Sequence, residues 1–161
     1  PTGVTSRAGS APHMRILGRM RIIDLPADRH DEVVELWRVS NLLAPWNDPY
    51  ADIRMAMDNP TSTVLAGLDG NDIIASAMVG YEGHRGWVFY VAVDPDQRGR
   101  GLGEEIMTAA FDWLEKLGAV KMQLLIRQGN EGVQAFYENL GFQVEPVIMM
   151  SKRIRPPANE L

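Results

Sequence analysis

A buried strand that runs into a glycine-rich loop and then into a long helix constrains the fold of this chain more than any other feature. Residues 87–93 (WVFYVAV) are apolar nearly throughout, which is typical of a central strand buried on both faces. Residues 94–100 form a polar loop, and apolar residues then recur at helical spacing: Leu102, Ile106, Ala109, Ala110, Trp113, Leu114 and Leu117. A strand, a loop and a helix in this order predict a sheet covered by helices.

The other elements predicted from periodicity and turn residues complete a mixed sheet. Ahead of the loop we expect a strand at 20–25, a helix opened by Asp28 or His30, a second short helix after the break at 44–49, and a hairpin of 63–68 with 73–81. After the first long helix we expect a strand at 122–126, a helix marked by Val133, Phe136 and Leu140, and two final strands at 142–144 and 147–154. The order β-α-α-β-β-β-α-β-α-β-β predicts a fold of the α/β class, or more broadly α+β, with a mixed sheet and helices on both faces.

A chain of 161 residues fits one domain with one core. We expect that domain at residues 19–155. Residues 1–18 mix Ser, Thr, Gly, Pro and Ala without periodicity, which favours a disordered leader or a cloning remnant, and residues 156–161 are expected to be a tail.

The composition argues against several classes of function. The net charge is −5, whereas a broad nucleic-acid surface needs clustered positive charge. Without cysteine there is no disulfide, thiolate metal site or cysteine nucleophile, and we expect no bound metal. No apolar run approaches the roughly 20 residues of a membrane span and no export signal is visible, so a cytoplasmic location is expected.

The loop itself has the features of an anion site. Glycines let the backbone approach a ligand, and the first N–H groups of the following helix point outward, which suits a phosphate or pyrophosphate. Arg98 and Arg100 add positive charge in an acidic chain. The nucleotide-kinase loop G-x-x-x-x-G-K-[ST] is absent, and the dinucleotide pattern G-x-G-x-x-G fails because its third glycine would be Glu104.

Two segments resemble motifs of the GNAT superfamily of N-acetyltransferases. Residues 98–103 (RGRGLG) are similar to its pyrophosphate loop, (Gln/Arg)-x-x-Gly-x-(Gly/Ala). Residues 130–142 (NEGVQAFYENLGF) are similar to its N-x-x-A-x-x-F-Y-x-x-x-G-F segment, with Val133 in place of alanine. Residues 45–49 and 83–87 resemble small bacterial members akin to YpeA.

The resemblance implies the GNAT fold, in which two central parallel strands splay apart and admit acetyl-CoA as cosubstrate. The pantetheine arm would pair with the backbone of the preceding strand, as an added strand does, and one strand N–H would polarise the thioester carbonyl. Asn130 matches a residue that hydrogen-bonds the cofactor, although its alternative role is a helix N-cap. The residues expected to bind the cofactor are Val91, Ala92, Val93, Arg98, Gly99, Arg100, Gly101, Leu102, Gly103, Glu104 and Asn130.

The implied reaction is direct transfer of the acetyl group to an amine. Tyr137 matches the position of the general acid that protonates the leaving thiolate, and its alternative role is a core aromatic beside Phe136. Many relatives place a glutamate base where this chain has Trp87. Glu82 is therefore the expected base, with His84 as the other candidate, unless both are solvated turn residues.

The acceptor is not defined by the sequence. Trp46, Asn47 and Asp48 lie in a loop that usually flanks the acceptor groove in this superfamily, where Asp48 could hold an amine; alternatively, the loop is a rigid proline-framed turn. The competing function is a non-catalytic acyl-CoA-binding or regulatory module. The apolar strand expected at 147–154 could pair across a homodimer.

Overall fold

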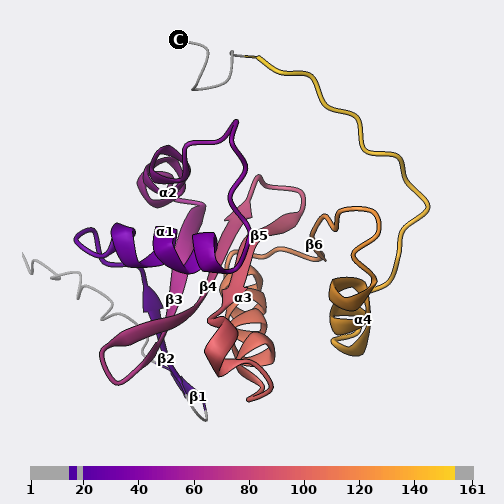
Figure 1. The fold of residues 1–161 in the computed structure, drawn as a ribbon. Helices are drawn as coiled ribbons and strands as arrows, with labels where there is room; N and C mark the ends of the chain where they lie inside the picture. The colour runs from indigo at the N-terminus through magenta and orange to yellow at the C-terminus, as the bar shows by residue number, and fades with distance from the viewer. Residues whose placement is uncertain (1–14, 18–19, 155–161) are drawn as a thin grey trace, which may run out of the picture.

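The computed structural model describes residues 15–17 and 20–154, and this part of the chain forms one mixed sheet with helices on both faces (Figure 1). The sheet order is β1-β2-β3-β4-β5-β6, with β1 (Arg15–Leu17), β2 (Met20–Asp24), β3 (Ser62–Asp69), β4 (Asp72–Tyr81), β5 (Gly86–Val93) and β6 (Met122–Gln123). The first five strands pair antiparallel, and β6 pairs parallel with β5. The helices are α1 (His30–Val39), α2 (Pro49–Asp58), the short 3-10 helix η1 (Pro95–Gln97), α3 (Leu102–Lys116) and α4 (Glu131–Asn139). The predicted mixed α/β fold is confirmed.

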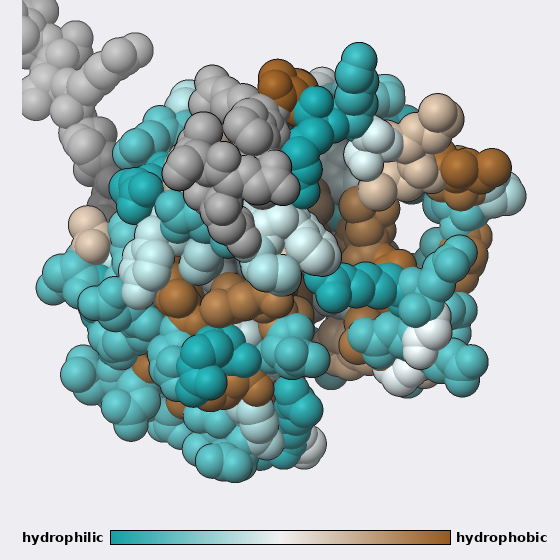
Figure 2. Space-filling view, turned by 45° about the horizontal axis from the view of Figure 1, so that its top comes forward, coloured by the Kyte–Doolittle hydropathy of each residue, from teal (hydrophilic) through white to brown (hydrophobic). Residues whose placement is uncertain are grey.

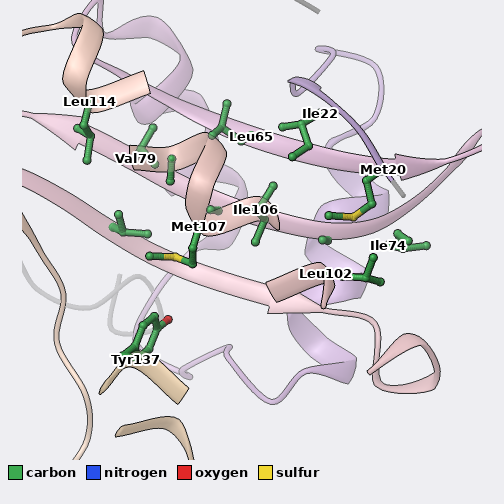
Figure 3. Packing of buried hydrophobic residues seen from close by; sticks show 14 residues of the cluster. Met20, Ile22, Leu65, Ile74, Val79, Leu102, Ile106, Met107, Leu114 and Tyr137 are labelled. Atoms are coloured by element: carbon green, nitrogen blue, oxygen red, sulfur yellow. The ribbon is translucent and has the colours of Figure 1, made fainter. Parts of the chain in front are cut away.

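Successive residues of β3 face opposite layers, which explains why the sheet is buried on both sides. Val64 and Ala66 pack against α1 and α2, whereas Leu65 packs against α3. Figure 3 shows Leu102, Ile106 and neighbouring α3 residues lying over the sheet. The predicted apolar stripe of α3 is therefore its core-facing side from Leu102 to Leu114. Leu117 was wrongly included, because α3 ends at Lys116 and Leu117 is 38% exposed.

The second layer is formed by α1 and α2. Val33, Leu36 and Trp37 of α1 are buried, as their spacing predicts, and Ile53 and Ala56 bury one face of α2.

The two parallel strands β5 and β6 diverge soon after they meet. They pair only at Gly86 with Met122 and at Trp87 with Gln123. On its other edge β5 stays paired with β4, through a register shift between Ser76 and Met78 of β4. The edge of β5 that faces β6 is thus unpaired from Val88 onward within the described residues, which is the splay expected of this fold.

Four predicted elements differ from the structure. The strand expected at 122–126 ends at Gln123. The strands expected at 142–144 and 147–154 are wrong, because this segment runs away from α4 in an extended, exposed path (Figure 1). A strand needs a neighbouring backbone to pair with, and β6 is too short to offer one. Phe89 is 42% exposed, so β5 is not buried on both faces throughout.

A short strand lies within the residues 1–18 that the sequence assigns to a leader. Arg15–Leu17 forms β1 because its backbone pairs with β2, from Arg15 opposite Ile22 to Leu17 opposite Met20. Backbone pairing with a neighbouring strand therefore forms a strand here, although the composition of residues 1–18 shows no strand periodicity. Residues 1–14 and 18 of the expected leader, and the expected tail at 156–161, lie outside the described residues.

Candidate functional site

The loop before α3 is shaped by two glycines with left-handed backbone. Gly99 has φ +78° and Gly101 has φ +79°, a region that side chains other than glycine rarely adopt. A Cβ built on either residue would meet nothing within 4 Å, so the space beside the backbone is open. Gly101 is the N-cap of the 15-residue helix α3. The loop therefore offers a glycine cradle and free helix N–H groups, which fits a phosphate group.

Gly103 is glycine for a different reason. A Cβ on this residue would lie 3.0 Å from the ring of Phe136. This close approach brings the start of α3 against α4, the helix that carries Tyr137 and follows Asn130.

The charges of the loop are not equivalent. Arg98 is exposed. The Arg100 guanidinium donates to Gln97 Oε1 and forms an ion pair with Asp69 at 3.4 Å, which ties the loop to the β3–β4 hairpin. Glu105, in the first turn of α3, accepts a 3.3 Å hydrogen bond from the backbone N–H of Met20. The positive potential of the cradle therefore comes mainly from Arg98 and the helix N-terminus.

The strand residues predicted to bind the cofactor lie at the splay. Val91, Ala92 and Val93 form the end of β5, with Ala92 opposite Ser76 and Val93 opposite Ala75 of β4. Their pairing with β4 uses one edge of β5. The other edge, toward β6, is unpaired in the described part of the chain and can accept an extended ligand as an added strand.

A cavity of about 1010 Å³ lies beside α3, β6, α4 and the C-terminal segment. It brings together Glu104, Asn130 and Tyr137, three of the residues that the sequence selects. The strand residues 91–93 and the loop residues 98–103 do not line it. Figure 2 shows an opening in the surface with hydrophobic residues along its rim.

Tyr137 is 8% exposed, and its ring makes edge contacts with Phe136 and Phe142. Burial raises the pKa of Tyr137 to about 12. Like an ordinary phenol it is protonated at neutral pH, and the raised pKa makes it a weaker acid. Tyr137 lines the cavity, where its hydroxyl can donate a hydrogen bond or a proton. Tyr137 is thus both a core aromatic and a candidate acid.

Asn130 is the N-cap of α4, and its Oδ1 accepts a 3.4 Å hydrogen bond from the backbone N–H of Val133. Its side chain borders the cavity as well. The capping role that the sequence left open is confirmed, and it leaves the amide NH₂ as a possible donor to a ligand.

A separate groove of about 570 Å³ lies between α2 and strands β4 and β5. Trp46 and Asn47, from the loop for which the sequence left two roles open, line this groove. Trp46 is 48% exposed and is not packed inward. Asp48 does not line the groove, because its carboxylate caps α2 by accepting bonds from the N–H groups of Tyr50 (3.0 Å) and Ala51 (3.1 Å). The acidic side chain in the groove is Asp52.

Glu82 lies in the turn between β4 and β5 and lines neither cavity. Its carboxylate accepts bonds from the backbone N–H groups of His84 (2.5 Å) and Arg85 (2.9 Å). Desolvation acts to raise the pKa of Glu82, but these hydrogen bonds outweigh it and hold the pKa below its ordinary value. Glu82 is therefore ionised at neutral pH, as a base must be, and is a weak one.

Sequence reasoning missed Tyr90 and Asp52, which are linked to each other and to Asn47 in the groove. The Tyr90 hydroxyl donates a 2.7 Å hydrogen bond to Asp52 Oδ2 and accepts one of 3.3 Å from Asn47 Nδ2. Tyr90 also has φ +50°, which is rare for a bulky residue and marks the irregularity in β5. A signal existed for Asp52, which precedes buried Ala56 by four residues and so borders the apolar face of α2.

Two absences hold for the described residues. No group of three or more acidic or histidine side chains there is arranged to hold a metal ion. No helix in 15–17 and 20–154 is long and apolar enough to cross a membrane.

Comparison with known proteins shows similarity to one family over most of the chain. The model of the "Acetyltransferase (GNAT) family" matches residues 30–142. A protein named "Acetyltransferase" from Yersinia pestis (strain Pestoides F) is 35% identical over 135 residues, covering 84% of this chain and 96% of its own length. "Acetyltransferase SG1711" of Sodalis glossinidius is 35% identical over 130 residues, covering 78% and 92%.

Solved structures show the same fold at low identity. AAC(6')-Iy in complex with the bisubstrate analogue CoA-S-monomethyl-acetylneamine has a TM-score of 0.72 at 19% identity, covering 84% of this chain and 99% of that one. Glucosamine-6-phosphate N-acetyltransferase from Arabidopsis thaliana has a TM-score of 0.65 at 21% identity, covering 86% and 100%.

The family model and the relatives at 35% identity define the class of this protein: it is an acyltransferase of the kind that uses an acyl-CoA. The chain belongs to the GNAT acetyltransferase family.

Proposed function

We propose that this N-acetyltransferase takes its acyl group from acetyl-CoA and transfers it directly to an amine. The observation that carries this proposal is the open edge of β5 beside the glycine cradle of Gly99 and Gly101. The extended thioester arm of the cofactor needs an open strand edge to pair with, and its pyrophosphate needs the glycine cradle.

The cradle would bind the pyrophosphate through backbone N–H groups of residues 99–104, with Arg98 as the nearby exposed cation. Val91 and Val93 would pair with the pantetheine arm on the free edge of β5. A backbone N–H of that strand would donate to the thioester carbonyl as negative charge develops on its oxygen. Asn130 would donate to the arm from its amide NH₂ while its Oδ1 caps α4.

The transfer needs one bond formed, one broken and two protons moved. The amine nitrogen attacks the acetyl carbonyl carbon, the C–S bond breaks, and the thiolate leaves. Tyr137, a protonated phenol that lines the cavity, would give a proton to the thiolate. The nitrogen loses a proton to a base, for which Glu82 stays our candidate, acting through water because it lies in the turn before β5.

The amine would enter from the groove between α2 and β5, which Tyr90 and Asn47 line. Because β5 forms one wall of this groove and also carries the open edge, an amine there approaches the strand that would hold the thioester.

The first experiment is calorimetric titration with acetyl-CoA of the wild type and of Gly101→Asp. We expect binding by the wild type and loss of binding in the variant, because a side chain at φ +79° is strained and a carboxylate repels phosphate. A wild type that binds no acetyl-CoA would refute the proposal. Release of CoA only when an amine is added would distinguish a transferase from a binding module.

Two further expectations belong to this proposal. A cytoplasmic location remains part of this proposal, and fractionation of cells tests it. A homodimer formed through residues 147–154 is supported by their exposure, with Ile148 92% and Met150 90% exposed. Light scattering of the purified protein measures its mass directly.

A further inference from the structure

The groove between α2 and β5 carries little charge. Of the residues that line its 570 Å³, the only ones with a charged side chain at neutral pH are Asp52 and Arg127. The walls are mostly apolar, and three of the apolar side chains are unusually exposed: Trp46 at 48%, Phe89 at 42% and Met55 at 71%. Large apolar side chains gathered at an exposed groove mark a binding surface for an apolar ligand.

Asp52 is fixed in this groove by a chain of contacts. Its Oδ2 accepts the 2.7 Å hydrogen bond from Tyr90, whose ring stacks on buried Trp37 with centroids 4.0 Å apart. Burial and the bond to Asp52 raise the pKa of Tyr90 to about 12, so the phenol stays a donor at neutral pH. A carboxylate has about four lone-pair sites, so a single bond to Oδ2 leaves acceptor capacity for a cationic ligand.

We propose that the acceptor is an amine with one positive charge on an aromatic or otherwise apolar body, and that Asp52 binds its ammonium group. This inference rests on the proposed function and adds the class of substrate. The apolar body would lie against Trp46, Phe89 and Met55, where aromatic faces also favour a cation. The ammonium first loses one proton to solvent water, which gives the neutral amine that attacks; this step precedes the two proton transfers of the reaction itself.

The same lining disfavours other amines. A polycationic amine needs several anions, and this groove offers one carboxylate, while Arg127 repels a second positive charge. A phosphorylated amino sugar presents several hydroxyl groups to walls that are largely apolar, where they would lose hydration without hydrogen bonds in return. Arg127 would pair with its phosphate, so the hydroxyl groups, and not the dianion, are what this groove leaves without partners.

The first test compares three amines with the full chain and acetyl-CoA: 2-phenylethylamine, neamine and glucosamine 6-phosphate. The readout is kcat/KM for CoA release. We expect 2-phenylethylamine to exceed each of the others by at least about tenfold, a difference of about 1.4 kcal/mol. A higher kcat/KM for neamine or glucosamine 6-phosphate overturns the inference.

The second test removes the charge of Asp52. In Asp52→Asn we expect KM for 2-phenylethylamine to rise about 10- to 100-fold, with the Kd for acetyl-CoA unchanged. Asp58→Asn is the matched control, because Asp58 lies on the same helix, is exposed and does not line the groove. An unchanged KM in Asp52→Asn overturns the role of Asp52.

A third variant does not depend on the folding of Asp52→Asn. Met55 is 71% exposed, so Met55→Lys should fold normally while adding a second cation to the groove wall. We expect it to raise KM for 2-phenylethylamine several-fold, and an unchanged KM counts against the groove as the acceptor site. Acetyl-CoA binding without CoA release from any of the three amines overturns this inference alone. A wild type that does not bind acetyl-CoA overturns the proposed function itself.

Discussion

The indole ring of Trp37 stacks on the phenol ring of Tyr90, with centroids 4.0 Å apart and planes inclined by 11°. The Trp37 Nε1–H donates a 2.9 Å hydrogen bond to Ser76 Oγ, and that hydroxyl donates to the carbonyl of Tyr90 at 3.3 Å. Tyr90 is the residue of β5 with φ +50°. The contact therefore joins α1 to the irregularity of the strand that carries the candidate site.

Replacing Trp37 should destabilise the protein. In Trp37→Phe the core loses volume at a side chain that is 0% exposed, together with the hydrogen bond to Ser76. We expect a loss of about 2 to 4 kcal/mol in the free energy of unfolding, measured by urea denaturation. Trp46→Phe, at an exposed indole, is the control and should change stability by less than about 0.5 kcal/mol. Equal losses in the two variants would contradict the packing role of Trp37.

Replacing Ser76, although it is a small residue, should also destabilise the protein. Ser76 is 0% exposed, and Ser76→Ala leaves the buried Nε1–H of Trp37 without its acceptor. We expect a loss of about 1 to 3 kcal/mol. In the double variant with Trp37→Phe the donor is gone too, so the combined loss should be smaller than the sum. Strict additivity in this double-mutant cycle would show that the bond contributes nothing.

Gly101 and Gly70 separate backbone strain from ligand binding. Gly101 has φ +79° in the loop and Gly70 has φ +61° in the β3–β4 turn, and a Cβ on either would meet nothing within 4 Å. Alanine at each position should therefore cost a similar amount, about 1 to 2 kcal/mol, from backbone conformation alone. Only Gly101→Ala should also weaken acetyl-CoA binding, by about tenfold or more in calorimetry, because only that loop forms the cradle. A matching loss of binding in Gly70→Ala would point to a general effect of destabilisation.

The elements that the sequence predicted correctly are those whose buried face is defined by the spacing of their own residues. The apolar stripe of α3 and the buried spacing of Val33, Leu36 and Trp37 follow from helical periodicity alone. The β3–β4 hairpin follows from two apolar runs around Asp69 and Asp72. In each case the side chains of one element are enough to define its buried face.

What the sequence missed depends on contacts between distant segments. Strand β1 forms because β2 offers a partner, whereas the segment at 147–154 has strand-like side chains and no partner in the described structure. Asp48 and Asp52 are four residues apart, and only the helix start at Pro49 decides that the first is a cap and the second faces the groove. Tyr90, which has a positive φ, contacts Trp37 and Ser76, and these lie 53 and 14 positions away in the chain.

The raised pKa of Tyr137 predicts a loss of stability at alkaline pH. Burial raises this pKa to about 12 from an ordinary value of 10.0, so below pH 10 the phenol is protonated in both the folded and the unfolded chain. Between pH 10 and pH 12 the unfolded chain releases the proton and the folded chain retains it, which favours unfolding. The free energy of unfolding should fall across this window, by at most about 1.4 kcal/mol per pH unit for one phenol.

Tyr137→Phe removes this phenol, so the stability of the variant should fall less steeply than that of the wild type when urea denaturation is repeated from pH 9 upward. Tyr90, with a pKa also near 12, leaves a residual slope in the variant. Identical slopes in the two proteins would mean that Tyr137 ionises as freely in the folded chain as in the unfolded one, and the buried donor assigned to the cavity would be lost with it.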